Sequence, residues 1–184
     1  MNRVDQLLEN YRNHLKLPQR ASLPAIQRTW FAVYPASEER RLLLRLYDFE
    51  HATRDAGLEW HPIDLQGCLS QWIDGVDPEE REAWMRDPDA IELYAENEWR
   101  DLIVDRIRKG FAAAARPHET VFAVTGLMEL FDLLHVSDVL EQLEDDMRGF
   151  LLVFFPGERE GNTYRFLNAR VGWDYLAVPI LSAK

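Results

Sequence analysis

Residue types that could do chemistry gather at three points where a β-rich apolar run gives way to a loop, namely residues 34–37, 125–127 and 155–157. In an open α/β sheet, ligands bind beyond the carboxyl ends of the strands, so a site is expected at these junctions. The first junction has the position of a phosphate-binding loop, but it lacks the glycines and the Lys-Ser/Thr pair that phosphate binding needs. ATP hydrolysis of the P-loop type is therefore not expected there.

Ser37 is the one candidate nucleophile at the first junction. A serine hydroxyl needs an adjacent base to become nucleophilic, and no Gly-x-Ser-x-Gly elbow surrounds Ser37. Two glutamates follow it directly, as in the first turn of a helix. We interpret Ser37 as a helix N-cap.

Metal-ligating residues are scattered along the chain. The lone Cys68 can form neither an intramolecular disulfide nor part of a cysteine-rich zinc site. The acidic runs 77–82 and 141–146 match no EF-hand loop and suit solvated helix faces. No His-x-x-x-His or His-x-Glu pair occurs among the five histidines, which are His14, His51, His61, His118 and His135. We predict no metal and no cofactor.

Composition and charge indicate an ordinary folded protein with acidic character. The 184 residues are 47% hydrophobic and 29% charged, and the formal net charge is −11. This charge repels the phosphate backbone, so direct nucleic-acid binding is disfavoured, and the short basic runs 40–41 and 106–109 suit solvated helix faces. Without a signal-like N-terminus or about 18 consecutive apolar residues, the sequence predicts a cytoplasmic location and no membrane contact.

Alternating strand and helix patterns indicate the fold class. Helices are expected over 3–16, 37–57, most of 66–109 and from Ser137 onward, and strands over 29–34, 58–65, 121–125 and 150–155, with 164–167 and 175–180 as further edge strands. We predict a single three-layer α/β domain over residues 1–184, of degenerate nucleotide-binding-like topology. Its mostly parallel sheet has about 4–5 strands flanked by helices, and residues 1–25 supply an N-terminal helix and linker.

Several boundaries follow from glycine, proline and capping residues. The helix over 37–57 should end near Gly57, and the helical stretch should close at Gly110 and Pro117. Pro156-Gly157 should end the strand over 150–155. Helices should start at Asp77-Pro78, at Asp87-Pro88 and, with Ser137 as its cap, before 139–147. One apolar stripe of the helix over 37–57 should comprise Leu42, Leu43, Leu46, Phe49 and Thr53.

The C-terminal part is rich in aromatic residues. Residues 162–166 and 172–176 combine Tyr, Trp, Phe and Arg with side-chain hydrogen-bonding groups. Tyr, Trp and Arg are frequent hot spots of protein interfaces, which favours a binding surface. An aromatic edge strand folded back on the sheet explains the same composition, and the sequence leaves both interpretations open.

The order and spacing of three motifs carry a resemblance to a known family. Residues 31–35, 122–126 and 152–158, the last followed by Asn162-x-Tyr164-Arg165-Phe166, resemble the BrxB family of bacteriophage-exclusion (BREX) defence systems. The resemblance runs from about residue 28 to residue 180. The short stretch before Asn162 and the ending over 172–176 depart from the family pattern. The resemblance implies a small non-enzymatic component that works beside an alkaline-phosphatase-like protein (PglZ), a large ATPase and a DNA methyltransferase.

The sequence thus predicts an interaction subunit of a BREX-like complex that binds a protein such as PglZ. A degenerate nucleotide-binding or hydrolytic enzyme using Ser37, Thr125 and Arg165 is the alternative, and a toxin or antitoxin-like partner is a third. The predicted partner-binding surface comprises Tyr34, Pro35, Phe155, Pro156, Gly157, Asn162, Tyr164 and Arg165, and these residues can equally serve to shape the fold.

Overall fold

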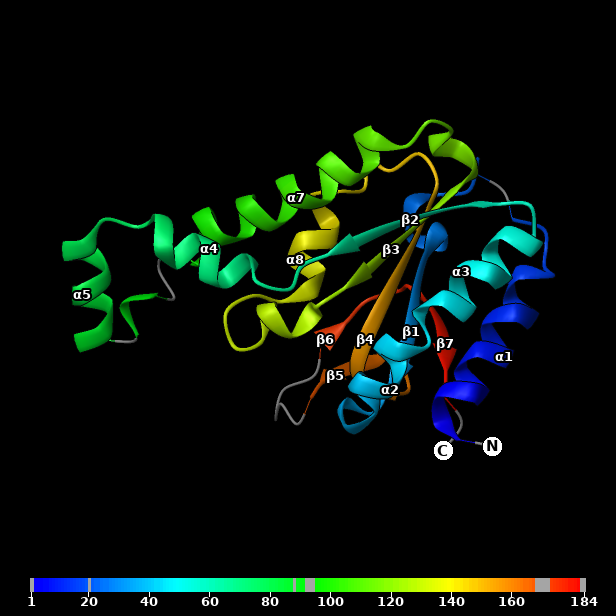
Figure 1. Ribbon diagram of the computed structural model, residues 1–184, viewed down its shortest axis with the longest axis horizontal. Helices are drawn as coiled ribbons and strands as arrows, with labels where there is room; N and C mark the ends of the chain where they lie inside the picture. The colour runs from blue at the N-terminus through cyan, green and yellow to red at the C-terminus, as the bar shows by residue number, and fades with distance from the viewer. Residues whose placement is uncertain (1, 20, 88, 92–94, 168–172, 183–184) are drawn as a thin grey trace.

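A computed structural model describes residues 2–19, 21–87, 89–91, 95–167 and 173–182. Five parallel strands form its sheet in the order β2-β3-β4-β1-β7 (Figure 1). They are β1 (Thr29–Tyr34), β2 (Glu59–Asp64), β3 (Thr120–Thr125), β4 (Phe150–Glu160) and β7 (Val178–Leu181). The predicted α/β class with a mostly parallel sheet between helical layers is confirmed.

Strand β4 is longer than predicted, because Pro156-Gly157 does not end it. Pro156 still pairs with Tyr34 of β1, and Gly157 is the first residue of β4 to pair with the antiparallel strand β5 (Thr163–Phe166). A Cβ at Gly157 would clash with the backbone carbonyl of Arg165, so only glycine allows the two strands this close. The Pro-Gly pair therefore marks where β4 passes from the parallel sheet into a hairpin, and β6 (Trp173–Asp174) continues that hairpin.

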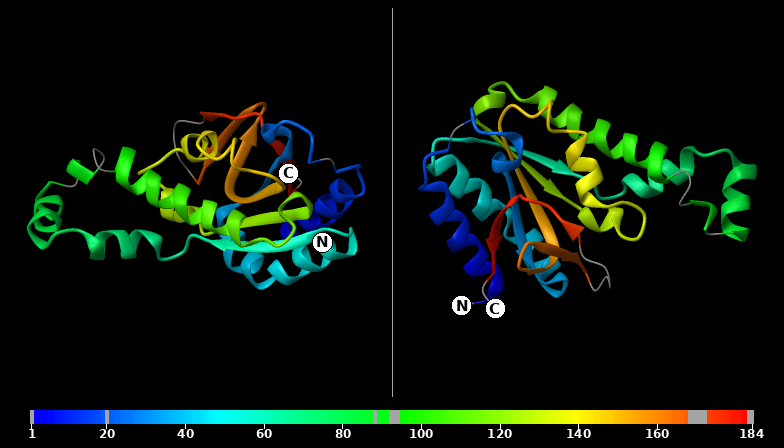
Figure 2. Two further views of the ribbon diagram at one scale, coloured as in Figure 1. Left: turned by 90° about the horizontal axis from the view of Figure 1, so that it is seen from above. Right: turned by 180° about the vertical axis from the view of Figure 1, so that it is seen from behind.

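Side chains of the central strands alternate between two apolar layers, as the pleat requires. One layer packs on α1 (Arg3–Leu15) and α3 (Leu46–Asp55), and it receives Trp30, Ala32, Tyr34, Val121, Ala123, Phe150, Leu152 and Phe154. The other packs on α7 (Arg100–Ala113), α8 (Val136–Glu141) and the hairpin, and it receives Phe31, Val33, Phe122, Val124, Leu151, Val153 and Phe155. Seen from above, the sheet lies between these layers (Figure 2).

The N-terminal helix agrees with its prediction. Asn2 and Asp5 form a reciprocal capping box at the start of α1, which satisfies two backbone donors that the first turn leaves over. The helix buries one stripe against the sheet, consisting of Val4, Leu7, Leu8, Tyr11 and Leu15.

The helix expected over 37–57 is interrupted. A short 3-10 turn η2 (Ala36–Glu38) precedes α2 (Glu39–Leu44), and α3 restarts after Arg45. The N-cap assignment of Ser37 is wrong, because the chain turns directly after Pro35 and leaves Ser37 inside the 3-10 turn without a capping bond. Leu43 is 42% exposed, so it does not belong to the core stripe, whereas Leu42 and Phe49 are fully buried. The end near Gly57, at a φ of 80°, is confirmed.

The segment between β2 and β3 projects from the sheet as an arm formed by α4 (Cys68–Gly75) and α5 (Pro78–Arg86) (Figure 1). Asp77 caps α5 as predicted. The second predicted start, at Asp87-Pro88, includes Pro88, which lies outside the described residues. Three indole rings hold the arm together, with Trp72 centred 5.1 Å from Trp84 and 5.4 Å from Trp99.

The return to β3 runs through η3 (Ala95–Trp99), α7 and η4 (Pro117–Glu119). Gly110 does not close α7, which continues to Ala113. A Cβ at Gly110 would lie 2.5 Å from Cδ1 of Ile63, so this glycine lets α7 approach β2. The prediction was wrong because the glycine serves a helix–strand contact and not a helix end.

Two further turns and a short helix complete the fold: η1 (Ala25–Arg28), η5 (Leu127–Leu130) and α8. Ser137 is the second residue of α8 and makes no capping bond, so its predicted role as N-cap is wrong; His135 occupies that position. The inward-facing residues after it, Val139, Leu140, Leu143 and Met147, are buried as expected. No helix in the described ranges has the length and apolar run that a membrane crossing needs.

Candidate functional site

The junction after β1 is closed by its own side chains. Tyr34 is 1% exposed, and its hydroxyl donates a hydrogen bond to the carboxylate of Glu39 at the start of α2. Burial and the negative charge of Glu39 raise the pKa of Tyr34 well above its ordinary value, so the hydroxyl stays protonated as a donor. Pro35 is half-buried beside it. The position that a phosphate would take in a phosphate-binding loop thus carries an internal Tyr–Glu bond.

The junctions after β2 and β3 are locked together. The Asp64 carboxylate accepts hydrogen bonds from the backbone of Gln66 at 3.0 Å and from the hydroxyl of Thr125 at 3.3 Å. Gly126 has a φ of 77°, and a Cβ there would lie 2.6 Å from the Gln66 nitrogen. Only glycine fits here, because it adopts a positive φ without strain and has no Cβ to clash with the Gln66 nitrogen. The two loops therefore pack on each other without room for a ligand between them.

Glu129 fastens the root of the arm to the loop after β3. Its carboxylate accepts hydrogen bonds from the backbone of Gly67 at 3.1 Å and Leu69 at 2.9 Å, in the first turn of α4. Backbone donors at a helix N-terminus attract anions, and here the chain supplies the anion itself. The sequence contained no local signal for this contact, because it joins residues about 60 positions apart.

The aromatic residues of the hairpin are folded back on the sheet. Tyr164 is fully buried, and its hydroxyl donates to the carbonyl of Ala177 at 3.1 Å. Its ring lies 4.8 Å from Phe31 and 5.8 Å from Phe155, and Tyr175 stacks on Phe31 at 5.8 Å. Burial raises the pKa of Tyr164. Of the two interpretations left open by the sequence, the structure bears out the folded-back strand for the described part of this segment.

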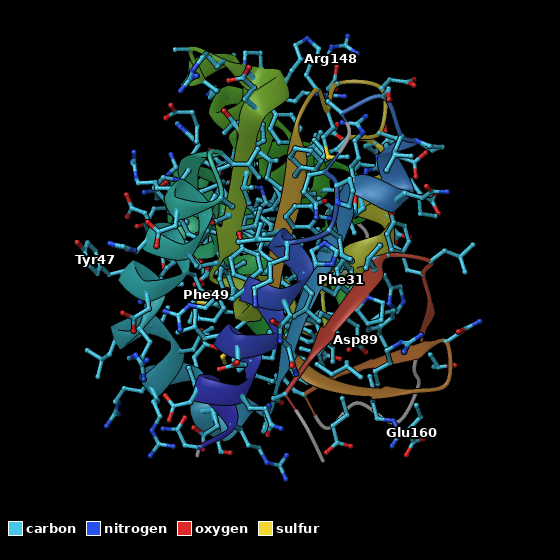
Figure 3. The ribbon with its side chains drawn as sticks, turned by 90° about the vertical axis from the view of Figure 1, so that its right-hand side faces the viewer. Phe31, Tyr47, Phe49, Asp89, Arg148 and Glu160 are labelled. Carbon is cyan, nitrogen blue, oxygen red and sulfur yellow. The ribbon has the colours of Figure 1, made fainter. Side chains whose placement is uncertain are left out.

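The eight residues predicted for partner binding divide into two groups. The larger group is buried and comprises Tyr34, Phe155, Pro156, Gly157 and Tyr164. Pro35, Asn162 and Arg165 reach the surface. Asn162 and Arg165 lie in the hairpin, where Arg165 pairs with Glu160 at 3.3 Å, and Glu160 points outward in Figure 3. The buried group shapes this end of the molecule from beneath, and the exposed group alone is available to a partner.

The three residues of the alternative nucleotide site come from separate elements. Ser37 follows β1, Thr125 ends β3, and Arg165 lies on β5, with β4 between β1 and β3. Thr125 is bonded to Asp64 and Arg165 to Glu160, and no hydrogen bond in the described part of the chain joins the three. The nucleotide site stays a prediction.

An apolar surface on α2 and α3 was missed at the level of sequence. Leu43, Leu44 and Tyr47 are 42%, 79% and 71% exposed, and we call these three side chains the apolar step. Figure 3 shows Tyr47 projecting from α3 while Phe49 points toward the sheet. The sequence did contain a signal for this surface. A single helical stripe through Leu42 and Phe49 leaves Leu43, Leu44 and Tyr47 outside it, so the segment has more apolar residues than one buried stripe needs.

No cluster of three or more His, Cys, Asp or Glu side chains suited to a metal occurs within the described ranges. Comparison of the chain with known proteins found no matching family model, no matching curated protein and no matching solved structure. Its function therefore has to be inferred from its own residues.

Proposed function

We propose that this chain is a non-enzymatic, protein-binding subunit of a bacterial anti-phage system of the BREX type, and that its partner is an alkaline-phosphatase-like protein of the PglZ kind. The system is suggested by the ordered motifs that resemble BrxB, among them residues 31–35 and 152–158. The partner-binding role is supported by the character of the molecular surface near the ends of the strands.

The apolar step is the observation that carries the proposal. Three large apolar side chains stand exposed within five residues, at the end of α2 and the start of α3. Full burial of an exposed apolar side chain of this size is worth about 1.5–3 kcal/mol, and Leu43, at 42% exposed, would gain less than Leu44 and Tyr47. Apolar side chains exposed side by side mark interaction sites more often than single ones do. Arg40 and Arg41 border the step, as polar rims border interface cores.

The closed junctions at the strand ends also support a binding role over a catalytic one. Tyr34 bonds to Glu39, Asp64 to Thr125, and Glu129 to the first turn of α4. These groups lie near the carboxyl end of the sheet, and their contacts hold the fold. A role in assembly fits this arrangement better than a reaction does.

Co-purification tests the proposal. The tagged chain is expressed with its native gene neighbourhood, and bound proteins are identified by mass spectrometry. We expect a phosphatase-like partner with the wild-type chain and its loss with Leu44→Glu or Tyr47→Glu. Met85→Glu is the matched control, since Met85 is 80% exposed but lies on the arm. Circular dichroism of each variant confirms that it is folded.

Recovery of the bait alone, or equal recovery of partners with all variants, contradicts the proposal. A rise in melting temperature with ATP, GTP or a dinucleotide would favour the enzyme alternative. A ligand at 100 times its Kd stabilises the native state by about 2.7 kcal/mol, which a thermal shift detects easily.

A further inference from the structure

A groove runs along the outer edge of the sheet, between β2 and α7. It consists of two adjoining hollows of about 240 and 170 Å³, which share His61 and Ala113. Seen from above, β2 lies at the border of the sheet with α7 on one side and α3 on the other (Figure 2). The groove therefore follows an extended strand over its whole length.

Two cations on α7 line this groove without ion-pair partners among the described residues. Arg106 and Lys109 are both exposed and stand one helical turn apart, and Arg106 makes only a long bond of 3.4 Å to the Asp64 carbonyl. The neighbouring Arg108 faces away and pairs with Asp105 at 3.7 Å and Asp146 at 2.6 Å. Asp64 and Glu59 also line the groove, but the Asp64 carboxylate bonds to Gln66 and Thr125, and Glu59 pairs with Arg116. Arg106 and Lys109 therefore leave the groove with a small net positive charge in a chain whose net charge is −11.

The negative charge of the chain is concentrated elsewhere. Residues 68–99 contain ten acidic and two basic residues, and α5 within this range projects beyond the far end of α7 from the groove. Charges separated by more than about 10 Å of solvent are largely screened at moderate salt. The acidic residues of α5 therefore leave the attraction of Arg106 and Lys109 for anions largely intact.

The edge of β2 is not built to accept another strand. Leu65 donates its backbone N–H to Thr125 of β3, so by alternation Trp60, Pro62 and Asp64 direct their backbone groups outward. Pro62 has no N–H to donate, and the Asp64 carbonyl already accepts from Arg106. These two features hinder the pairing of another strand with the edge of β2. A ligand in the groove must therefore be recognised mainly by side chains.

We propose that this groove binds an extended acidic segment of the protein partner, an inference that rests on the proposed function and adds a second contact to it. Carboxylates of the segment bind Arg106 and Lys109, and its apolar side chains contact the exposed Pro62 and Ala113. The six residues of β2 span about 20 Å, which fits a segment of five or six extended residues. A nucleic acid fits less well, because its continuous phosphate charge would also face the acidic remainder of the surface.

Fluorescence anisotropy with a fluorescein-labelled peptide of alternating Glu and Val tests this site. We expect saturable binding to the wild-type chain that weakens with salt, and a loss of affinity of at least about tenfold in Arg106→Gln/Lys109→Gln. Arg108→Gln is the matched control and should bind like wild type, since it removes one positive charge from the same helix outside the groove. A peptide of alternating Gln and Val should not bind.

Three outcomes would overturn the proposal. One is the absence of saturable binding up to about 1 mM peptide, a concentration that corresponds to a binding free energy of only about −4 kcal/mol. Another is an equal loss of affinity in the Arg108→Gln control. The third is tighter binding of an oligothymidylate at Arg106 and Lys109, which would replace the acidic peptide with a nucleic acid.

The partner capture described above separates this inference from the proposed function. We expect Arg106→Gln/Lys109→Gln to capture less partner than Arg108→Gln does. Equal capture by both variants would overturn the groove as a docking site and leave the proposed function standing. Failure of the wild-type chain to capture any partner would instead contradict the proposed function.

Discussion

The two faces of the sheet are built in different ways. The face covered by α1 and α3 is regular: two amphipathic helices lay their apolar stripes on alternate strand residues. The opposite face is assembled from α7, short turns, α8 and a hairpin that folds back across it. The irregular face therefore carries the arm and the groove, while the helices of the regular face stabilise the sheet and present the apolar step on their outer side.

The largest effects should come from neighbouring residues of β1 that enter opposite faces. Trp30 stacks on Phe150 at 5.1 Å beneath α1, and Phe31 stacks on Phe155 at 5.5 Å beneath the hairpin. Each is fully buried, so replacement by alanine should lower the free energy of unfolding by about 3–5 kcal/mol. Urea denaturation measures this loss.

Hydrogen exchange then separates the two faces. Trp30→Ala should speed exchange first in α1, and Phe31→Ala first in β5. The exposed Leu44→Ala is the control and should change stability by no more than about 0.5 kcal/mol. If both core variants loosened the same elements, the two faces would not be separate packing units.

Two glycines with the same backbone conformation allow a narrower comparison. Gly57, at the end of α3, has a φ of 80° and nothing within 4 Å of a built Cβ. Gly126, on the second face, has a φ of 77° and the Gln66 nitrogen at 2.6 Å. Gly57→Ala should cost about 1 kcal/mol from backbone strain alone, whereas Gly126→Ala should cost about 2–4 kcal/mol because overpacking adds to it. Equal losses in denaturation would show that the two loops can separate at little cost.

The root of the arm provides a smaller effect. Glu129→Gln removes the charge that Gly67 and Leu69 bind and leaves one amide oxygen as acceptor, so stability should fall by about 1–2 kcal/mol. Amide exchange at Leu69 should accelerate while exchange in β3 stays slow. Asp145→Asn, an exposed acidic position, is the control and should leave both unchanged. Unchanged exchange at Leu69 in Glu129→Gln would mean that this carboxylate does not hold the arm.

The regular face was largely predictable from the sequence because its signals are local. The stripe of α1 repeats with the helical period, and residues 29–34 form an uninterrupted β-rich run. Two of the errors arose where a glycine serves a distant contact. Gly110 accommodates Ile63, and Gly157 accommodates the backbone of Arg165. Glycine in a sequence marks a special backbone position but not which distant element requires it.

The candidate site was less predictable for a related reason. Aromatic residues such as Phe155 and Tyr164 suit both an interface and a core, and composition does not tell the two apart. The exposed apolar step depends on the break at Arg45, whose guanidinium is held by Asp48 and by Asp5 of α1. That break follows from tertiary contacts and has no local signal. The predicted stripe was also drawn too wide, since Leu43 lies about 100° around the helix from Leu42.

The smallest effect separates the faces by pH. His14 of α1 lies edge-on to Trp30, with ring centroids 4.6 Å apart, and its Nε2 is buried without a hydrogen-bond partner among the described residues. Burial lowers its pKa below 6.5, so the folded chain disfavours the protonated form. Above about pH 6.5 the imidazole is neutral in both the folded and the unfolded chain, so it does not change the free energy of unfolding with pH. As the pH falls below that value, the unfolded chain binds the proton first and stability declines until the folded pKa is passed.

His14→Phe should remove this part of the pH dependence. Between pH 7.5 and 5, the urea midpoint of the wild-type chain should fall more than that of His14→Phe. Protonation of Asp5 also lowers the stability of the folded chain, because Arg45 lowers the pKa of Asp5. This loss occurs at lower pH and is the same in the wild-type chain and in His14→Phe. The difference between the two profiles therefore isolates His14. Parallel profiles would mean that the ring reaches water when it is protonated, and that α1 covers the regular face less tightly at its C-terminal turn than Trp30 and Tyr11 suggest.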